Sequence, residues 1–149
     1  MINIHTEQNL RKINMAKKKK VNFTYSVGRR RSASARVRLY KGEGENTVNG
    51  IVVGKYFVGI GNAIWNKPFE LTDTVGKYYF TAKVVGGGKN GQLDAVILGI
   101  SRALTIVKPE KHKSVIKKAG LLKRDARIRE RRKVGTGGKA RRKRQSPKR

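Results

Sequence analysis

Six residues near the middle of the sequence have the glycine spacing of a dinucleotide-binding turn. Gly86-Gly87-Gly88-Lys89-Asn90-Gly91 matches GxGxxG, and it follows an apolar run and precedes a helical pattern. A dinucleotide site also needs a second parallel strand after the helix and an acidic residue about 20 positions on. Pro109 and a second helical pattern follow instead, and the only acid there is Glu110. We therefore interpret the glycines as a turn that lets a phosphate approach the amides at a helix start.

Other side chains that could perform catalysis are isolated in the sequence. His5 and His112 have no sequence-adjacent partner for a triad or a metal site, so we expect both at the surface. Asp125 and Glu130 are expected to form ion pairs with neighbouring arginines. The chain has no cysteine, which excludes thiolate ligands and a cysteine nucleophile. The sequence thus predicts a binding protein rather than an enzyme, with no metal and no cofactor.

Basic side chains are the strongest chemical signal, because 37 Lys and Arg face 9 Asp and Glu. Such an excess repels itself in a compact state unless a polyanion neutralises it, so we expect a nucleic acid partner. Guanidinium groups bind phosphate in a bidentate fork and stack on exposed bases. The cations form three clusters, which are Arg29, Arg30 and Arg31; Arg124, Arg127, Arg129, Arg131, Arg132 and Lys133; and Lys139, Arg141, Arg142, Lys143 and Arg144.

The chain divides into three zones. Residues 1–20 form a basic extension that we expect to be disordered, residues 21–120 a globular core, and residues 121–149 a basic tail that is disordered when free. All aromatic residues fall between Phe23 and Phe80, so the core forms there. The opening residues also fit a transit peptide, or an extension upstream of a start at Met15. No apolar run approaches the ~20 residues of a membrane span, so we expect no membrane partner.

Period-two alternation predicts strands over residues 21–27 and 35–40, joined by a connection over residues 28–34. Asn49-Gly50 between short apolar pairs predicts a hairpin. A further strand is predicted over residues 78–85, where three glycines end it.

The period changes from Gly91 onward. Leu93, Val96, Ile97, Ile100, Leu104 and Val107 fall at the spacing of one helical face, which must lie on the sheet, and Asp94 is placed in the first turn. Pro109 ends this helix and begins a second, with Val115, Ile116 and Ala119 as its apolar side and Gly120 as its C-terminal cap. Strands followed by helices indicate an α+β fold.

From Gly86 to Leu104 the sequence GGGKNGQLDAVILGISRAL closely resembles the ninth small-subunit ribosomal protein family of bacteria and organelles. The resemblance runs from about Tyr25 to Arg149, through GRRR at 28–31, Asn49-Gly50, KPFEL at 67–71, KRDAR at 123–127 and the final Lys148-Arg149. It implies a core like the second domain of the fifth small-subunit protein. That core is a small mixed sheet with helices packed on one face and a left-handed βαβ crossover, located in the subunit head.

The resemblance also implies a function. The protein would be a structural constituent of the small subunit in translation, on a cytoplasmic or an organellar ribosome. Its partners would be small-subunit rRNA, P-site tRNA and neighbouring ribosomal proteins, with no small-molecule substrate. In the family the last residues contact the anticodon stem-loop of P-site tRNA, which points to Lys148 and Arg149, with Arg144 and Lys143 behind them. The rRNA-binding candidates are the remaining members of the three basic clusters together with Gly86, Gly87, Gly88 and Lys89.

Two pairs of residues depart from the family pattern. Leu93-Asp94 replaces the usual small pair after the glutamine, and Ser146-Pro147 stands where an aromatic-serine pair is common. The second change removes a stacking side chain from the tail, and Pro147 would stiffen the approach of Lys148. A free-standing RNA-binding protein or RNA chaperone is the alternative function, because charge alone supports it. Co-sedimentation with ribosomes separates the two.

Overall fold

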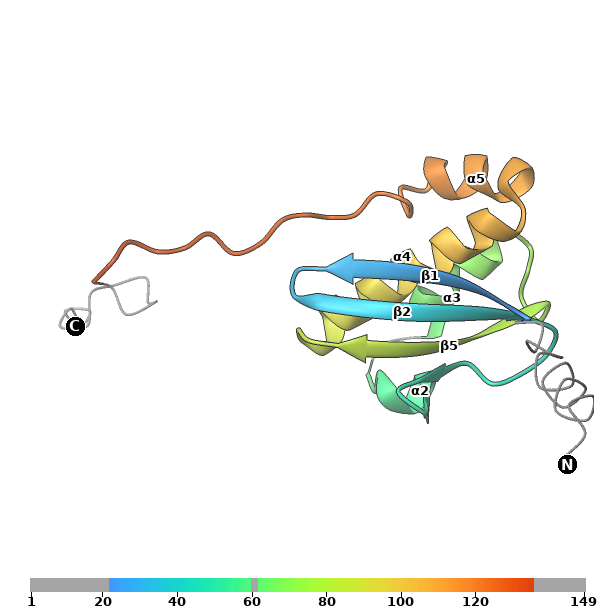
Figure 1. Ribbon diagram of the computed structural model, residues 1–149, viewed down its shortest axis with the longest axis horizontal. Coiled ribbons are helices and arrows are strands. Elements are labelled where there is room, and N and C mark those ends of the chain that lie inside the picture. Colours follow the sequence, from blue (N-terminus) through green and yellow to red (C-terminus); the bar gives the residue numbers. More distant parts are fainter. Residues whose placement is uncertain (1–21, 60–61, 136–149) are drawn as a thin grey trace, which may run out of the picture.

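The computed structural model describes residues 22–59 and 62–135, in which two helices stand between the fourth and the last strand and two more follow the last strand (Figure 1). The elements are β1 (Phe23–Arg30), β2 (Ala33–Lys41), β3 (Thr47–Val48), β4 (Ile51–Val52), α2 (Val53–Tyr56), α3 (Asn62–Leu71), β5 (Tyr78–Val85), α4 (Lys89–Val107) and α5 (Pro109–Lys118). The strands of the described part form one sheet in the order β1-β2-β5-β3-β4. Among the strand pairs of the described residues only β3–β5 is parallel, and α3 lies in its crossover. The predicted α+β fold with a mixed sheet is confirmed.

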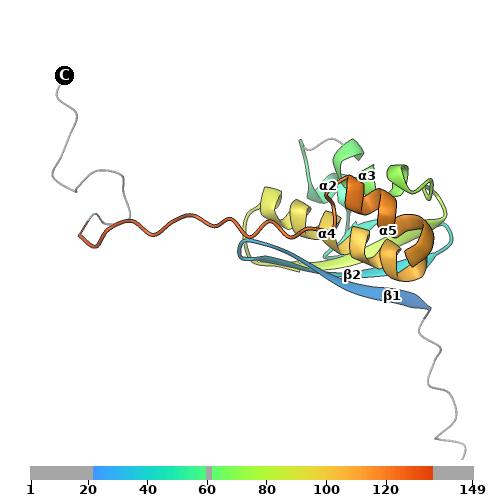
Figure 2. The same cartoon turned by 90° about the horizontal axis from the view of Figure 1, so that it is seen from above.

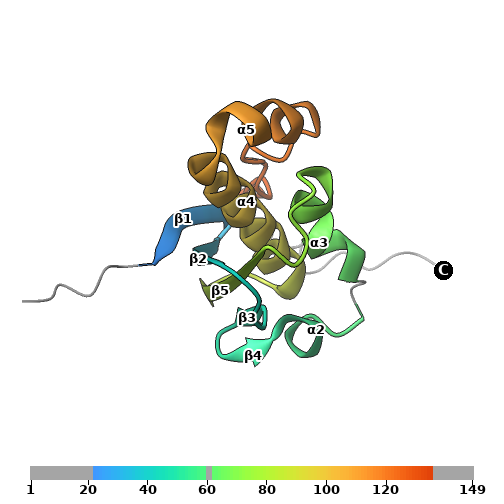
Figure 3. The ribbon, with the colours of Figure 1, turned by 90° about the vertical axis from the view of Figure 1, so that its right-hand side faces the viewer.

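The three longer helices lie on one face of the sheet, and no helix of the described residues covers the opposite face (Figure 3). Helix α4 packs across β1 and β2, while α5 contacts α4 and α3. Helix α3 covers β5 through aromatic rings, because the ring centroids of Trp65 and Phe69 lie 6.1 and 6.2 Å from that of Phe80. The core therefore fills one space between sheet and helices.

Alternation within the strands decides which side chains enter this core. In β2 the side chains of Ala33, Ala35, Val37 and Leu39 are buried, whereas Arg36 and Arg38 are exposed. The apolar face predicted for α4 is also confirmed, since Leu93, Val96, Ile100 and Leu104 are all buried. The buried side chains of β2, at every second residue, pack against the buried side chains of α4, at helical spacing.

Two glycines let α4 approach β1 with almost no side chain between the backbones. A Cβ atom built on Gly28 would lie 1.8 Å from the carbonyl oxygen of Ala95 and 2.6 Å from the amide nitrogen of Gly99. A Cβ on Gly99 would lie 2.5 Å from Cγ2 of Val37. The Ser26 hydroxyl uses this proximity and donates a hydrogen bond of 2.6 Å to the carbonyl of Gly99. Residue 28 must therefore be glycine for the helix to lie where it does.

The predicted connection over residues 28–34 is wrong in length. Strand β1 continues to Arg30 and β2 begins at Ala33, so only Arg31 and Ser32 form the turn. The glycine and the arginines resemble turn residues, but Gly28 sits inside the strand because a helix backbone approaches it there. The first-turn position predicted for Asp94 is also wrong, because α4 begins at Lys89 and places Asp94 in the second turn.

The apolar side predicted for α5 is confirmed at Ile116 and wrong at Val115 and Ala119. Ile116 is buried, but Val115 is 38% exposed and Ala119 is also exposed, and His112, one turn before Ile116, is buried as well. The surface position predicted for His112 is therefore wrong, and His5 lies outside the described residues. The predicted cap at Gly120 is confirmed, since its φ is +74° and its amide donates to the carbonyl of Lys117.

Burial of His112 should make the stability of the core depend on pH. Its side chain is 7% exposed and Nε2 has no hydrogen-bond partner within the described residues. Desolvation, and then the charges of Lys108 and Lys111, lower the pKa of His112 below the ordinary 6.5. As pH falls below about 6.5 the unfolded chain takes up a proton that the folded chain excludes. We therefore expect the free energy of unfolding to fall, by at most about 1.4 kcal/mol per pH unit.

Urea titrations at pH 7.5, 6.5 and 5.5 would measure this effect, and the comparison is with His112→Leu. We expect the variant to lose most of the difference between pH 6.5 and 5.5. Lys113→Gln on the exposed side of α5 is the control and should keep the wild-type pH dependence. An unchanged dependence in His112→Leu would contradict the assignment.

Candidate nucleic-acid interface

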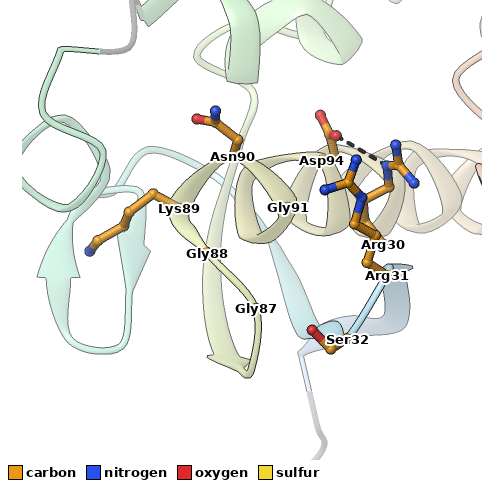
Figure 4. A pocket seen from close by; sticks show the side chains of 9 residues that line it. All are labelled: Arg30, Arg31, Ser32, Gly87, Gly88, Lys89, Asn90, Gly91 and Asp94. Atoms are coloured by element: carbon orange, nitrogen blue, oxygen red, sulfur yellow. Dashed lines mark ion pairs between the residues drawn. The ribbon is translucent and has the colours of Figure 1, made fainter. Parts of the chain in front are cut away.

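Two turns from distant parts of the sequence lie against each other and line an open pocket of about 530 Å³ (Figure 4). One is the Arg31-Ser32 turn between β1 and β2, and the other is the glycine turn between β5 and α4. A Cβ on Gly86 would lie 2.5 Å from the carbonyl oxygen of Ser32, and one on Gly87 would lie 2.9 Å from Cβ of Ala33. Both glycines also have positive φ, so the contact between the turns depends on them.

The third glycine leaves room for a ligand. Gly88 is the N-cap of α4, it makes no side-chain capping hydrogen bond, and a Cβ there would meet nothing within 4 Å. The amides of the first helical turn have no acceptor inside the helix, and the helix dipole places partial positive charge at this end. An anion such as a phosphate fits this pocket electrostatically.

The charged side chains that line the pocket point in different directions and make different contacts (Figure 4). Arg31 is exposed in a left-handed backbone conformation with φ of 50°, which is unusual for a residue with a Cβ. Asp94 pairs with Nε of Arg30 at 3.5 Å. The Nζ atom of Lys89 donates to the carbonyl of Tyr56 and lies 3.5 Å from the centroid of its ring. Arg31 is therefore the cation best placed to meet a ligand.

A chain of hydrogen bonds supports the glycine turn, and sequence reasoning missed it. The side-chain Nε2 atom of Gln92 donates to the carbonyl of Gly86, and Tyr56 donates from its hydroxyl to Oε1 of Gln92. Asn49 donates to the Tyr56 hydroxyl and to the carbonyl of Val84, while its Oδ1 accepts from the amide of Val84. The Asn49-Gly50 pair identified the hairpin turn, but nothing in its spacing indicated that the Asn49 side chain would bond to β5.

Arg30 fastens the start of the basic C-terminal segment to the core. Its Nη1 atom donates to the carbonyl of Arg127 at 2.8 Å, and its Nη2 atom lies 3.0 Å from the Asp125 carboxylate. Arg127 closes on the same carboxylate, which confirms the ion pair predicted for Asp125. Hydrogen bonds from Arg127 and the charges of Arg127 and Arg30 hold the pKa of Asp125 far below its usual range. We call this set of contacts the arm anchor.

Beyond the anchor the chain runs away from the globular part as an extended arm (Figures 1 and 2). Leu121 and Leu122 still pack against the core, so the described part of the arm is residues 123–135. Its exposed predicted cations are Arg124, Arg127, Arg129, Arg131, Arg132 and Lys133. Arg30, the residue before the Arg31-Ser32 turn, lines the pocket and holds the chain at Asp125 and Arg127, so the arm begins beside the pocket.

The three arginines at 29–31 therefore lie in three different environments. Arg30 belongs to the arm anchor, Arg31 faces the pocket, and Arg29 lines a groove beside Lys67 and Lys123. The remaining predicted cations lie outside the described residues. They are Lys139, Arg141, Arg142, Lys143, Arg144, Lys148 and Arg149.

Metal and membrane sites have no support in the part of the chain that the structure describes. No group of three potential metal-ligating side chains is found there. No helix within it is both long and apolar enough to cross a bilayer.

Comparison with known proteins gives the family. The sequence model described as ribosomal protein S9/S16 matches residues 28–149, which include the pocket, the anchor and the arm. The chain belongs to this family. The small ribosomal subunit protein uS9 of Maridesulfovibrio salexigens is 48% identical over 118 residues, which are 78% of this chain and 90% of that protein. The uS9 protein of Desulfotalea psychrophila is 46% identical over 115 residues, which are 76% and 88% of the two chains.

Membership in the S9/S16 family makes the chain a structural ribosomal protein and not an enzyme. The GxGxxG sequence accordingly forms a structural turn. Its glycines let this turn pack against the Arg31-Ser32 turn. The resemblance of the sequence to the ninth small-subunit ribosomal protein family is confirmed.

Proposed function

We propose that the chain is a structural component of the small ribosomal subunit that binds rRNA through the pocket and the arm. The observation that carries this proposal is the anchored arm, because an extended basic segment cannot bury a core of its own and needs a polyanion to neutralise it. The pocket adds a compact phosphate site at the end from which the arm leaves. Neighbouring small-subunit proteins are the other partners we propose, on a cytoplasmic or an organellar ribosome.

The pocket residues have distinct roles in this proposal. Arg31 would hold a backbone phosphate in a bidentate fork, and the amides at the start of α4 would donate to the same oxygens. Gly88 leaves the space that this approach needs. Along the arm, Arg124 and the arginines after it would meet successive phosphates.

We also propose that the end of the arm contacts P-site tRNA. Lys148 and Arg149 would hold phosphates of the anticodon stem-loop, with Lys143 and Arg144 behind them, and the family resemblance supports this role. Deleting Lys148 and Arg149 should weaken P-site tRNA binding to reconstituted small subunits while incorporation of the protein is unchanged. Equal tRNA affinity with and without the two residues would refute this part of the proposal.

Sedimentation tests the ribosomal assignment. A lysate is run through sucrose gradients at low and high salt, and the chain is followed by mass spectrometry beside a known small-subunit marker. Co-migration with the small subunit that survives high salt supports the proposal. Migration only with free RNA, or at the top of the gradient, would refute it and favour a free-standing RNA chaperone.

A further inference from the structure

The face of the sheet away from the helices carries an arrangement that neither the pocket nor the arm uses. In the strand register Tyr25 lies opposite Arg38, and Arg36 lies opposite both Val27 and Lys83. Tyr25, Arg36, Arg38 and Lys83 are all exposed, and none of the described helices covers this side (Figure 3). We call these four residues the open face.

Within the described residues, the charges of the open face are not neutralised by ion pairs. Strands β1, β2 and β5 contain no Asp or Glu. Within residues 22–59 and 62–135 no ion pair involves Arg36, Arg38 or Lys83. Arg36 and Lys83 lie directly opposite each other on neighbouring strands. Like charges in such a pair repel each other and destabilise a sheet. A polyanion lying across the strands would convert this repulsion into attraction.

The open face also presents an aromatic ring. Tyr25 is 49% exposed, and its ring has no aromatic partner in the described part of the chain. Beside it Arg38 lies 5.0 Å from the centroid of Phe23. The four side chains line a hollow of about 500 Å³, which Thr47, Asn49 and Gly50 of the β3–β4 hairpin also line. That volume is within the range of about 300–1,000 Å³ found for small-molecule sites, so it has room for a flipped-out nucleotide.

We propose that the open face binds an unpaired segment of RNA, with a base stacked on Tyr25 and phosphates held by Arg36, Arg38 and Lys83. The proposal rests on the RNA-binding function proposed above and adds a second contact on the other side of the core. Stacking on an aromatic ring needs a base free of its duplex, so single-stranded RNA fits better than a helix. An acidic protein would satisfy the cations but would leave the flat, half-exposed ring without a matching partner.

Fluorescence anisotropy with the full chain tests the stacking. The probe is a labelled uridine oligonucleotide of about 12 nucleotides, in about 300 mM salt to weaken phosphate contacts by the arm. Tyr25→Ala should lower the affinity by about 5- to 100-fold, and Tyr25→Phe should stay close to wild type because the ring remains. Affinity for a duplex RNA probe should be equal in all three proteins. Equal affinity of wild type and Tyr25→Ala for the oligonucleotide would overturn the proposal.

Matched charge variants test the phosphate contacts. Replacing Arg36, Arg38 and Lys83 with Gln should make the slope of log affinity against log salt shallower by about 2. Replacing Lys111, Lys113 and Lys117 with Gln removes the same charge from α5, on the other side of the core, and should change the slope less. An equal or larger change from the α5 variant would overturn the assignment to this face. Circular dichroism melts confirm that each variant is folded.

Ultraviolet crosslinking in assembled particles separates this inference from the proposed function. If the wild-type chain co-sediments with small subunits and its Tyr25 peptide crosslinks to a nucleotide, the inference is supported. If the chain co-sediments but that peptide crosslinks to protein or to nothing, the inference is overturned while the ribosomal function stands. If the chain neither co-sediments nor binds RNA, the proposed function itself has failed.

Discussion

Removing residues 123–149 should lower the affinity for RNA by about a thousandfold or more at low salt, while the core stays folded. The segment holds 14 of the 37 Lys and Arg and only two of the nine acids. If about six to ten of its cations meet phosphates, the slope of log affinity against log salt becomes shallower by about 4 to 9. Nitrocellulose filter binding between 50 and 300 mM salt measures both quantities.

A cut after Leu122 is chosen because Leu121 and Leu122 still pack against the core. Deletion of residues 1–20, which carry only six Lys and Arg, is the control and should change the slope far less. If the two deletions changed the slope equally, the arm would be no more than one part of a diffuse basic surface.

Replacing Gly28 with alanine should be the most destabilising single methyl addition in the described core. The new Cβ would overlap the carbonyl of Ala95, which is main chain and cannot rotate away. Helix α4 would have to lift from β1, which breaks the Ser26 hydrogen bond to Gly99 and opens the core. We expect a loss of about 3 kcal/mol or more, which lowers the melting temperature by about 12 °C or more.

Differential scanning calorimetry measures this loss, and Gly88→Ala is the matched control. Gly88 has a φ of −98° and open space around its Cα, so the same methyl group should change the melting temperature by only a few degrees. A melting temperature for Gly28→Ala equal to that of the control would show that α4 does not lie against β1 as described.

The elements predicted well from sequence are those whose apolar period is unbroken. Helix α4 has an uninterrupted helical face, β5 is bounded by glycines, and the β3–β4 hairpin has an Asn-Gly turn. Helix α3 was not predicted, because Pro68 lies inside it and removes a backbone donor. Packing of Trp65 and Phe69 on Phe80 holds α3 in place. A local sequence pattern does not predict a contact between segments so far apart in the chain.

The candidate site was predicted by residue type but not by arrangement. Counting arginines identified the cluster at 29–31, yet only the position of the turn decides that Arg31 faces the pocket while Arg30 holds the arm. Recognising Gly28 as a strand glycine would have placed the turn correctly. The role of Asn49 as a side-chain partner of β5 depends on the parallel pairing of β3 with β5, which sequence alone does not specify.

The arm anchor determines how the arm searches for its own contacts. Because Arg30 holds the chain at Asp125 and Arg127, a core docked on RNA keeps the next described residues, 128–135, within reach of that point. The second encounter then becomes intramolecular, at an effective concentration in the millimolar range for a short flexible linker. Phosphate contacts along the arm that are weak one by one can therefore form at the same time. Once the core has bound, these contacts can form in any order.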